Sequence, residues 1–333
     1  MTAFKSLAGL VAALMLAAAF GSPTRAQQYT VSSITMTDIG NVASAPTGSS
    51  TFQTAPSTGA VTRIAGSAVR LTSGSARSLV TVGCVGEVEC PAATVLIAVS
   101  QTGTPTGRAG ALQNFTASLT SGSFLAAPGT GNSISFTFVG IPDGGSRTFY
   151  VGFDFPLSGD NGGASSGPST ANFAVSATTL LGTQGGSLAG LATANVFRSI
   201  AITNSSALAF GRITRPRTGS GTVSLAAATG AVTTTGTGVT RMPSPASTAA
   251  SFTATGEGGQ SFSVSVPSTF DLTNGGDTIV VTLTPSTSGN QSFSGAIGSA
   301  GTLPILVGGS FALTSTTALG TYTGTFGVTV AYN

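Results

Sequence analysis

IGNVASAPTGSSTFQTAPSTGAVT, residues 39–62, returns as FGRITRPRTGSGTVSLAAATGAVT at residues 210–233. The offset is 210 − 39 = 171 residues, and 11 of the 24 aligned positions are identical without a gap. A period this long indicates a duplicated domain and not a solenoid repeat. We therefore expect two tandem domains built on related frames, residues 27–198 and residues 199–333.

Apolar residues in both halves recur with a period of two. The runs end in turn residues at positions 143–145, 274–277 and 308–309, where Gly and Asn accept positive φ. No 12-residue window after residue 26 has a helical stripe. This pattern predicts an all-β chain of two tandem immunoglobulin-like β-sandwich domains. The alternation is clearest at Ile134, Phe136 and Phe138; Phe149, Val151, Phe153 and Phe155; Phe262, Val264 and Val266; and Ile279, Val281 and Leu283.

Residues 1–26 have the layout of a secretory signal peptide. One early cation, Lys5, precedes an apolar run at residues 7–20, and small residues lead to Ala26. We expect cleavage after Ala26. The run is shorter than the ~20 residues of a membrane span, and later apolar stretches are interrupted by Gly, Ser or Thr. The sequence predicts export to the periplasm and then to the cell surface or medium, with no transmembrane segment after signal removal.

Charged residues are scarce and histidine is absent. The 333 residues include 12 Lys+Arg and 9 Asp+Glu, or 6% charged against roughly 25% in an average globular protein. Without histidine, the chain cannot build a Ser-His-Asp triad or a His-ligated zinc site. Nucleic-acid binding needs clustered cations to displace counterions, so we expect no nucleic-acid partner. We also expect no cofactor and no enzymatic activity.

The two halves end differently. The second half finishes with GTYTGTFGVTVAYN, residues 320–333, in which five apolar side chains share one face of an expected strand. In the first half, the aromatic strand at residues 147–155 is followed by a polar loop and another candidate strand at residues 171–176. The first domain therefore looks complete, whereas the second lacks a closing strand and leaves an apolar edge. The five residues are Tyr322, Phe326, Val328, Val330 and Tyr332.

This terminal pattern, together with Leu208-Ala209-Phe210-Gly211, resembles the secreted bacterial family labelled domain of unknown function 4402. It is also similar to the spore-coat-U group of archaic chaperone-usher pilins. The resemblance covers residues 205–333, and it extends to residues 30–155 only through the internal repeat. It implies an incomplete sandwich that a periplasmic chaperone holds, that an usher assembles, and that a strand from a donor subunit completes.

Carried onto this chain, the resemblance makes the face of Tyr322, Phe326, Val328, Val330 and Tyr332 the edge of the strand acceptor. Such pairing is β-augmentation, in which main-chain hydrogen bonds give affinity and alternate side chains fill pockets. Only residues 27–31 precede the expected opening strand around Ile34 and Met36. The chain can then accept a strand but has little to donate, which is the layout of a tip subunit whose first domain binds a surface ligand of unknown identity.

Two clusters stand out as candidate sites. Cys84 and Cys90 are the only cysteines, and an exported chain meets an oxidising compartment, so we expect a disulfide between them. The enclosed loop displays Glu87 and Glu89, either as functional carboxylates or as solvated side chains on a stapled hairpin. Arg212, Arg215 and Arg217 form the densest positive charge after residue 26, either as an anionic contact or as a solubilising loop.

Other motifs favour ordinary structural roles. Residues 163–167 fit the Gly-x-Ser-x-Gly pattern of hydrolases but lie in a polar loop, with no histidine to activate the serine. Asp160 and Asn161 lack the further oxygen ligands that Ca²⁺ requires. The apolar residues 124–127 are a surface contact or a strand end.

The leading hypothesis is a non-enzymatic exported surface protein, a pilus tip adhesin or adhesin-like pilin assembled by donor-strand complementation. The alternative is a free-standing secreted or outer-surface structural protein with two complete sandwiches and no pilus role. A carbohydrate-active enzyme would need paired cleft carboxylates, which nine scattered acids do not suggest.

Overall fold

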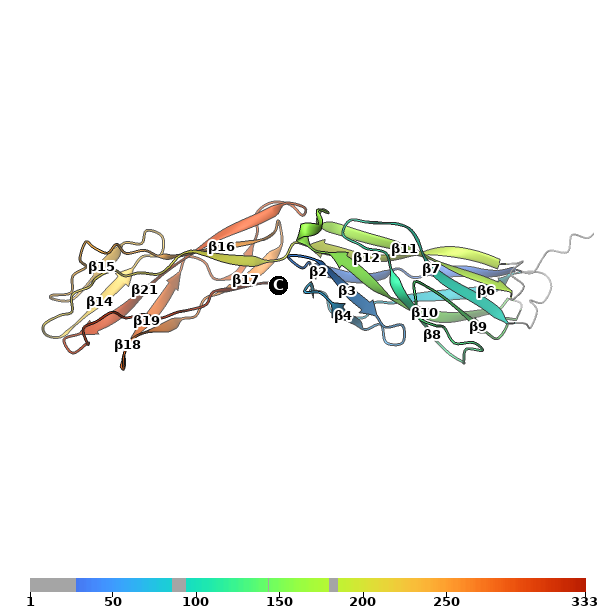
Figure 1. Cartoon of the computed structure of the whole chain (residues 1–333), viewed down its shortest axis with the longest axis horizontal. Coiled ribbons are helices and arrows are strands. Elements are labelled where there is room, and N and C mark those ends of the chain that lie inside the picture. The colour runs from blue at the N-terminus through green and yellow to red at the C-terminus, as the bar shows by residue number, and fades with distance from the viewer. Residues whose placement is uncertain (1–27, 86–93, 143, 180–184) are drawn as a thin grey trace, which may run out of the picture.

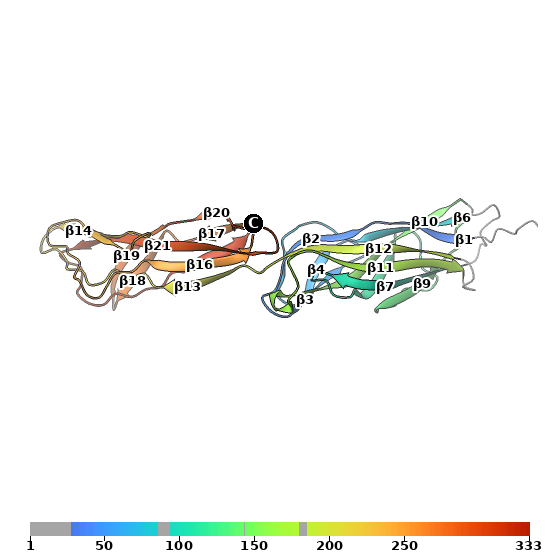
Figure 2. The same ribbon diagram turned by 90° about the horizontal axis from the view of Figure 1, so that it is seen from above.

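The computed structural model describes residues 28–85, 94–142, 144–179 and 185–333. They form two β-sandwiches that lie end to end, with the C-terminus beside the joint between them (Figures 1 and 2). The only helical element among the described residues is one short 3₁₀ turn, η1 (Asp160–Gly162). The prediction of an all-β chain with tandem β-sandwiches is confirmed.

Strands β1–β12 build the first sandwich. They form one sheet in the order β4-β3-β10-β6-β1-β12-β11-β7-β9, with β2 beside β12, β5 beside β2 and β8 beside β10. The sheet folds over on itself, and a short parallel contact between β1 and β12 joins its two layers. The strands are β1 (Gln28–Ile34), β2 (Thr37–Ala43), β3 (Ser49–Thr54), β4 (Val61–Ala65), β5 (Val69–Arg70), β6 (Ser78–Val85), β7 (Val95–Thr106), β8 (Gln113–Leu119), β9 (Ser133–Phe138), β10 (Ser146–Ser158), β11 (Gly167–Thr179) and β12 (Gly185–Phe197).

The second sandwich is built from two separate sheets. The larger has the order β13-β16-β21-β14-β15, with β19 beside β21 and β18 beside β19, and the smaller has the order β20-β17-β22. The strands are β13 (Ala201–Ser206), β14 (Ser220–Leu225), β15 (Val232–Thr234), β16 (Ala250–Glu257), β17 (Ser261–Ser265), β18 (Thr269–Asn274), β19 (Asp277–Pro285), β20 (Gly289–Ser292), β21 (Ala300–Thr314) and β22 (Thr329–Tyr332).

The repeated stretch adopts the same backbone twice. Strands β3 and β14 begin and end at positions 171 residues apart. Gly40 and Gly211 have φ values of 80° and 78°, so both need the left-handed conformation that glycine tolerates. In the turn that follows each strand, the amide of Gly59 donates to the carbonyl of Ala55 at 2.7 Å, and the equivalent pair in the second sandwich is 2.8 Å apart. The offset found in the sequence is therefore a structural equivalence.

Each sandwich has its own core, because alternate side chains on each strand face inward. The first core is rich in phenylalanine, including an edge-to-face pair of Phe136 and Phe149 with ring centroids 5.1 Å apart. The second core is centred on a stacked pair, Phe262 and Phe293, at 4.0 Å. The predicted alternating runs lie in strands that face these cores, except that Val266 follows the end of β17 and packs against the second core from there.

Two local predictions were wrong. Residues 308–309 lie inside β21 and not in a turn. Glycine is required at position 308 for another reason, because a Cβ there would lie 2.2 Å from the carbonyl oxygen of Leu225 on the neighbouring strand. The opening strand starts at Gln28 and not near Ile34, since residues 28–34 already pair with β6. The predicted signal peptide lies outside the described residues.

Candidate functional site

One strand distinguishes the two sandwiches. In the first, β12 lies between β11, to which it is antiparallel, and β2, to which it is parallel. It bonds β11 continuously from Gly185 to Val196 and thereby closes the seam between the two halves of the sheet.

The second sandwich repeats this order without that strand. The path β4-β3-β10-β6-β1 corresponds to β15-β14-β21-β16-β13, and the path β11-β7-β9 corresponds to β22-β17-β20. Within the described part of the chain, no strand takes the place of β12. The segment equivalent to β2, residues 208–214, therefore forms only isolated bridges, at Ala209 and at Ile213.

The empty position is an apolar groove of about 900 Å³. One wall is the β2-equivalent segment, with Leu208 and Phe210, and the other is the terminal segment, residues 319–326. Phe252 and Phe311 lie at its base. For comparison, a strand of eight residues spans about 27 Å at ~3.4 Å per residue.

The terminal segment only partly matches its prediction. Tyr322 and Phe326 line the groove, and Val328 is buried in the second core. Val330 and Tyr332 lie in β22, which pairs with β17. All five side chains pack against the core, as their shared face predicted. The expectation of one strand over residues 320–333 was wrong, because β22 covers only Thr329–Tyr332 and the preceding residues lack a continuous neighbour.

The second core is correspondingly less enclosed. Among the described residues, eight phenylalanines of the first sandwich are 0–1% exposed, whereas Phe262 is the only phenylalanine of the second sandwich that is so deeply buried. Core residues that face the groove, such as Phe210 and Phe311, each retain 8% exposure. Exposed Leu319 adds an apolar side chain at the open end of the groove, at 75% exposure. Apolar surfaces of this size on soluble proteins are typical of sites that contact another chain or a ligand.

The arginine cluster lies at the end of the groove far from the joint. Strand β21 runs from near the joint to Thr314, and Arg215 donates to the carbonyl of Thr317 just beyond it. Bridging between residues 213 and 241 brings Arg241 beside Arg212. Arg212 and Arg215 line the groove, while exposed Arg217 follows in the same loop. Within the described residues, none of these four guanidinium groups forms an ion pair.

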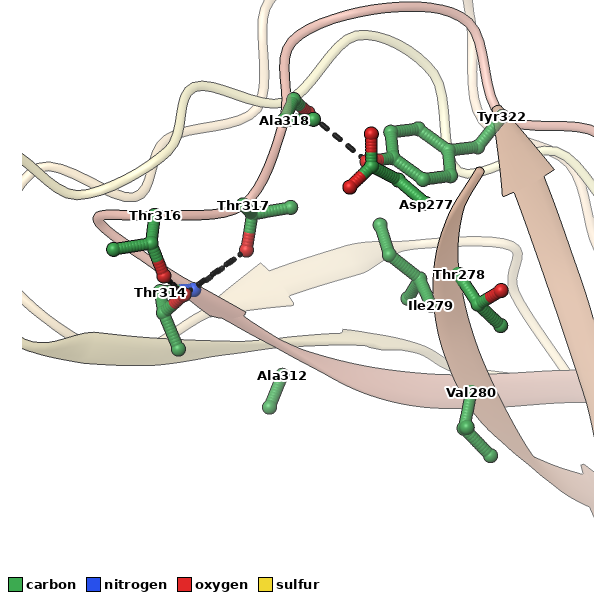
Figure 3. A pocket seen from close by; sticks show the side chains of 10 residues that line it. All are labelled: Asp277, Thr278, Ile279, Val280, Ala312, Thr314, Thr316, Thr317, Ala318 and Tyr322. Atoms are coloured by element: carbon green, nitrogen blue, oxygen red, sulfur yellow. Dashed lines mark hydrogen bonds between the residues drawn. The ribbon is translucent and has the colours of Figure 1, made fainter. Parts of the chain in front are cut away.

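A second, smaller pocket of about 290 Å³ adjoins this end (Figure 3). The hydroxyl of Tyr322 donates to the carbonyl of Ala318 at 3.1 Å, and the amide of Thr314 donates to Thr317 at 2.9 Å. Asp277 supplies its only carboxylate. Because the other lining residues are threonines, aliphatics and Tyr322, the pocket offers no pair of carboxyl groups for glycoside hydrolysis.

The joint between the sandwiches is held by buried polar groups. Asp160 accepts from Arg108 at 2.7 Å, from Ser44 at 2.6 Å, and from the amide and hydroxyl of Ser199. Burial alone would raise the pKa of Asp160, but the hydrogen bonds from Ser44, Ser199 and Arg108 outweigh it and lower that pKa below its ordinary value. The carboxylate is therefore ionised at neutral pH and ties the linker to the first sandwich.

The terminal strand also reaches the joint. The hydroxyl of Tyr332 donates to the carbonyl of Arg198 at 2.9 Å and accepts from the amide of Glu257 at 2.7 Å. Burial, followed by the charges of Glu257 and Asp160, raises the pKa of Tyr332 to about 12. Fully buried Glu257 in turn accepts from the amide of Arg198 at 2.9 Å.

Two further candidates have separate outcomes. Cys84 is buried in β6, but Cys90, Glu87 and Glu89 lie outside the described residues, so their disulfide and their display loop stay predictions. The apolar segment at residues 124–127 is anchored, because the ring of Phe124 packs edge to face on that of Phe136 at 5.1 Å.

Strand β12 and the Asp160–Arg108 pair are not predicted by the hydropathy pattern of the sequence. Strand β12 consists largely of Gly, Ala and Ser, and its inward side chains are small. Its alternation at Gly190, Ala192, Ala194 and Val196 is a signal that an amphipathic period-two search could detect if alanine were counted as apolar.

Residues 200–332 match the family model "Domain of unknown function (DUF4402)", which covers the second sandwich. No curated protein matches the chain. Similar solved structures include a chaperone–tip adhesin complex of CFA/I fimbriae biogenesis, at 10% identity over 92% of this chain and 84% of that one, with a TM-score of 0.23. Another is a mutant of the CFA/I adhesin CfaE of enterotoxigenic E. coli, at 12% identity over 90% and 93%, with a TM-score of 0.22.

At these TM-scores the two similar structures define neither the fold nor the function of this chain. The description of its fold and site therefore rests on its own geometry. Among the described residues, no helix has the length and apolar character that a membrane crossing requires. No three acidic, cysteine or histidine side chains gather there as potential metal ligands.

Proposed function

We propose that the chain is a non-enzymatic, exported subunit of a surface fibre, with a strand-accepting second sandwich and an adhesive first sandwich. A strand from a donor subunit fills the groove after a periplasmic chaperone has occupied it and an usher has brought the subunits together. The observation that carries the proposal is the seam that β12 closes in the first sandwich and that no described strand closes in the second.

The placement at the fibre tip is supported by the other end of the chain. Strand β1 pairs with β6 from Gln28 onward, so residues 28–34 belong to the first sandwich and are not free to enter a neighbouring subunit. With its own seam closed by β12, the first sandwich is a self-contained body at the far side of the joint (Figure 1). This is the position of a module that binds a surface.

Peptide complementation of the purified chain, residues 27–333, tests the acceptor role. The peptide copies β12 but carries valine at its four inward positions, and a matched peptide carries serine there. The valine peptide at 100 times its Kd should stabilise the second sandwich by about 2.7 kcal/mol, because it binds only the folded state. Segment-resolved hydrogen exchange should show new protection at residues 207–214 and 319–326. Equal effects of the two peptides, or no protection there, would refute the acceptor role.

The tip placement needs a separate experiment. On cells that carry the protein, antibodies raised against residues 28–197 should label the ends of surface fibres in electron micrographs. Labelling along whole fibres would contradict the tip placement, and label on released protein alone would favour a free-standing secreted sandwich protein.

A further inference from the structure

We propose that the donor chain carries carboxylates at the end of its inserted strand and just after it, where they pair with Arg212 and Arg215. This inference rests on the proposed function and adds the chemistry of the partner. It follows from the equivalence of the two sandwiches, since β12 shows where each residue of an inserted strand lies.

The direction of the inserted strand comes from that template. Strand β12 is parallel to β2 and antiparallel to β11. In the second sandwich, the β2-equivalent segment runs from Leu208, near the middle, towards Arg215 at the end far from the joint. An inserted strand in the same arrangement therefore leaves the groove, carboxyl end first, at the arginine cluster. The body of the donor subunit lies beyond that point, because the opposite end faces the joint (Figure 2).

Two arginines occupy positions that contact the closing strand in the first sandwich. Arg212 is equivalent to Asn41, which accepts a hydrogen bond from Asn195 of β12 at 3.2 Å. Arg215 is equivalent to Ser44, whose amide donates to the carbonyl of Phe197, the last residue of β12, at 2.9 Å. An inserted strand therefore brings its Asn195-equivalent residue to Arg212 and its first residues beyond the strand to Arg215.

The charge at this exit is unbalanced, unlike that in the first sandwich. There, the carboxylate of Asp160 belongs to the sandwich and binds Ser199, two residues after β12. Ser158 pairs with Ser49, and Thr314 pairs with Ser220, the residue equivalent to Ser49. Thr314 is therefore equivalent to Ser158, and Thr316, two residues later, takes the position of Asp160. The first sandwich thus pairs its acid with Arg108 at this exit, whereas the second offers arginines, and within its described residues no carboxylate is close enough to pair with them. A donor with carboxylates is the complement.

Three capped peptides test the inference on the purified chain, residues 27–333. All extend the β12 template through the position of Ser199 with valine at the inward positions, and capping removes their terminal charges. One has aspartate at the positions of Asn195 and Arg198, the second has asparagine there, and the third has its two aspartates at the opposite end, at the positions of Gly185 and Ser187. Affinities are measured by calorimetry at low and high salt.

The first peptide should bind about two- to tenfold more tightly than the second, since two exposed ion pairs contribute that much. The advantage should shrink in high salt and vanish in the double variant Arg212→Gln/Arg215→Gln, while the control variant Arg63→Gln/Arg147→Gln on the first sandwich retains it. The third peptide should show no advantage. Unchanged binding of the neutral peptide to the double variant verifies that its groove is folded.

Each remaining outcome has a distinct meaning. If no valine peptide binds, the proposed acceptor function fails, and this inference fails with it. If all three bind equally, or if the double variant retains the advantage, the groove accepts strands but the acidic partner is wrong. A preference for the third peptide would refute the strand direction on which the inference depends.

Discussion

Replacing Asp160 with asparagine should destabilise the first sandwich and loosen the joint. The side chain of Arg108 is 1% exposed and that of Asp160 is 23% exposed, with 2.7 Å between Nη1 and Oδ1. Removing one partner of a fully buried pair costs about 3–5 kcal/mol, because a charge is left without compensation. Since water reaches part of Asp160, and since Ser44 and Ser166 still accept from Arg108, we expect about 2–3 kcal/mol for Asp160→Asn.

Urea unfolding of the full chain, followed by linear extrapolation, measures this change. Asp154→Asn is the matched control, because Asp154 is also buried but accepts from the neutral amides of Gln53 and Asn114. The Asp154→Asn substitution should lower the free energy of unfolding by about 1 kcal/mol. The double variant Arg108→Met/Asp160→Asn should be more stable than Asp160→Asn alone, since it leaves no buried charge.

The pH dependence provides an independent check. The folded-state pKa of Asp160 lies below its unfolded value, so its contribution is present above the unfolded pKa of about 3.9 and is lost as pH falls through the folded pKa. The difference between wild type and Asp160→Asn should therefore be constant at neutral pH and shrink in acid. A pH-independent difference, or a double variant no more stable than the single one, would show that the ion pair is not the cause.

Four further predictions concern the groove, the seam and the joint. Leu319→Ser should weaken valine-peptide binding several-fold in calorimetry while changing the free energy of unfolding by less than about 0.5 kcal/mol, because Leu319 is 75% exposed and lines the groove. Gly190→Ala should cost about 1–3 kcal/mol in urea unfolding, since its Cβ would meet the ring of Phe173 at 2.3 Å, whereas Gly129→Ala meets nothing within 4 Å and should be neutral. Alkaline titration of tyrosinate absorbance should lose a component near pH 12 in Tyr332→Phe; the raised pKa means that the hydroxyl's contribution is present below about pH 10 and is lost as pH rises through 12. Hydrogen exchange of the chain without peptide should be faster in the second sandwich than in the first, and equal protection of the two would contradict an open seam.

Much of the architecture could be predicted from the sequence. The alternating aromatic runs fixed the strands of both cores, because a period of two places every second side chain on one face. The repeat at residues 39–62 and 210–233 predicted matching backbones, which the paired φ values of Gly40 and Gly211 bear out. Of the predicted acceptor edge, Tyr322 and Phe326 line the groove, and the acceptor role stays a prediction.

Long-range polar contacts could not be predicted in this way. Asp160 and Arg108 are 52 positions apart, and Tyr332 meets Arg198 across 134 positions. Hydropathy patterns carry no information on such pairs, since a polar residue in a turn looks the same whether it is solvated or buried. The arginines were visible in the sequence, but their place at the exit of the groove depends on the register that the first sandwich supplies.

The terminal segment shows how a missing neighbour changes the outcome of a correct pattern. Residues 320–333 alternate as regularly as β11, yet β11 is a strand over Gly167–Thr179 and β22 only over Thr329–Tyr332. Backbone amides and carbonyls need partners, and β11 has them on both sides, from β7 and from β12. The terminal segment has β17 on one side and, before Thr329, only an isolated bridge at Thr323. Side-chain periodicity thus encodes a longer strand than the described chain can pair, and the difference lies along the groove, where an inserted strand would supply the absent hydrogen bonds.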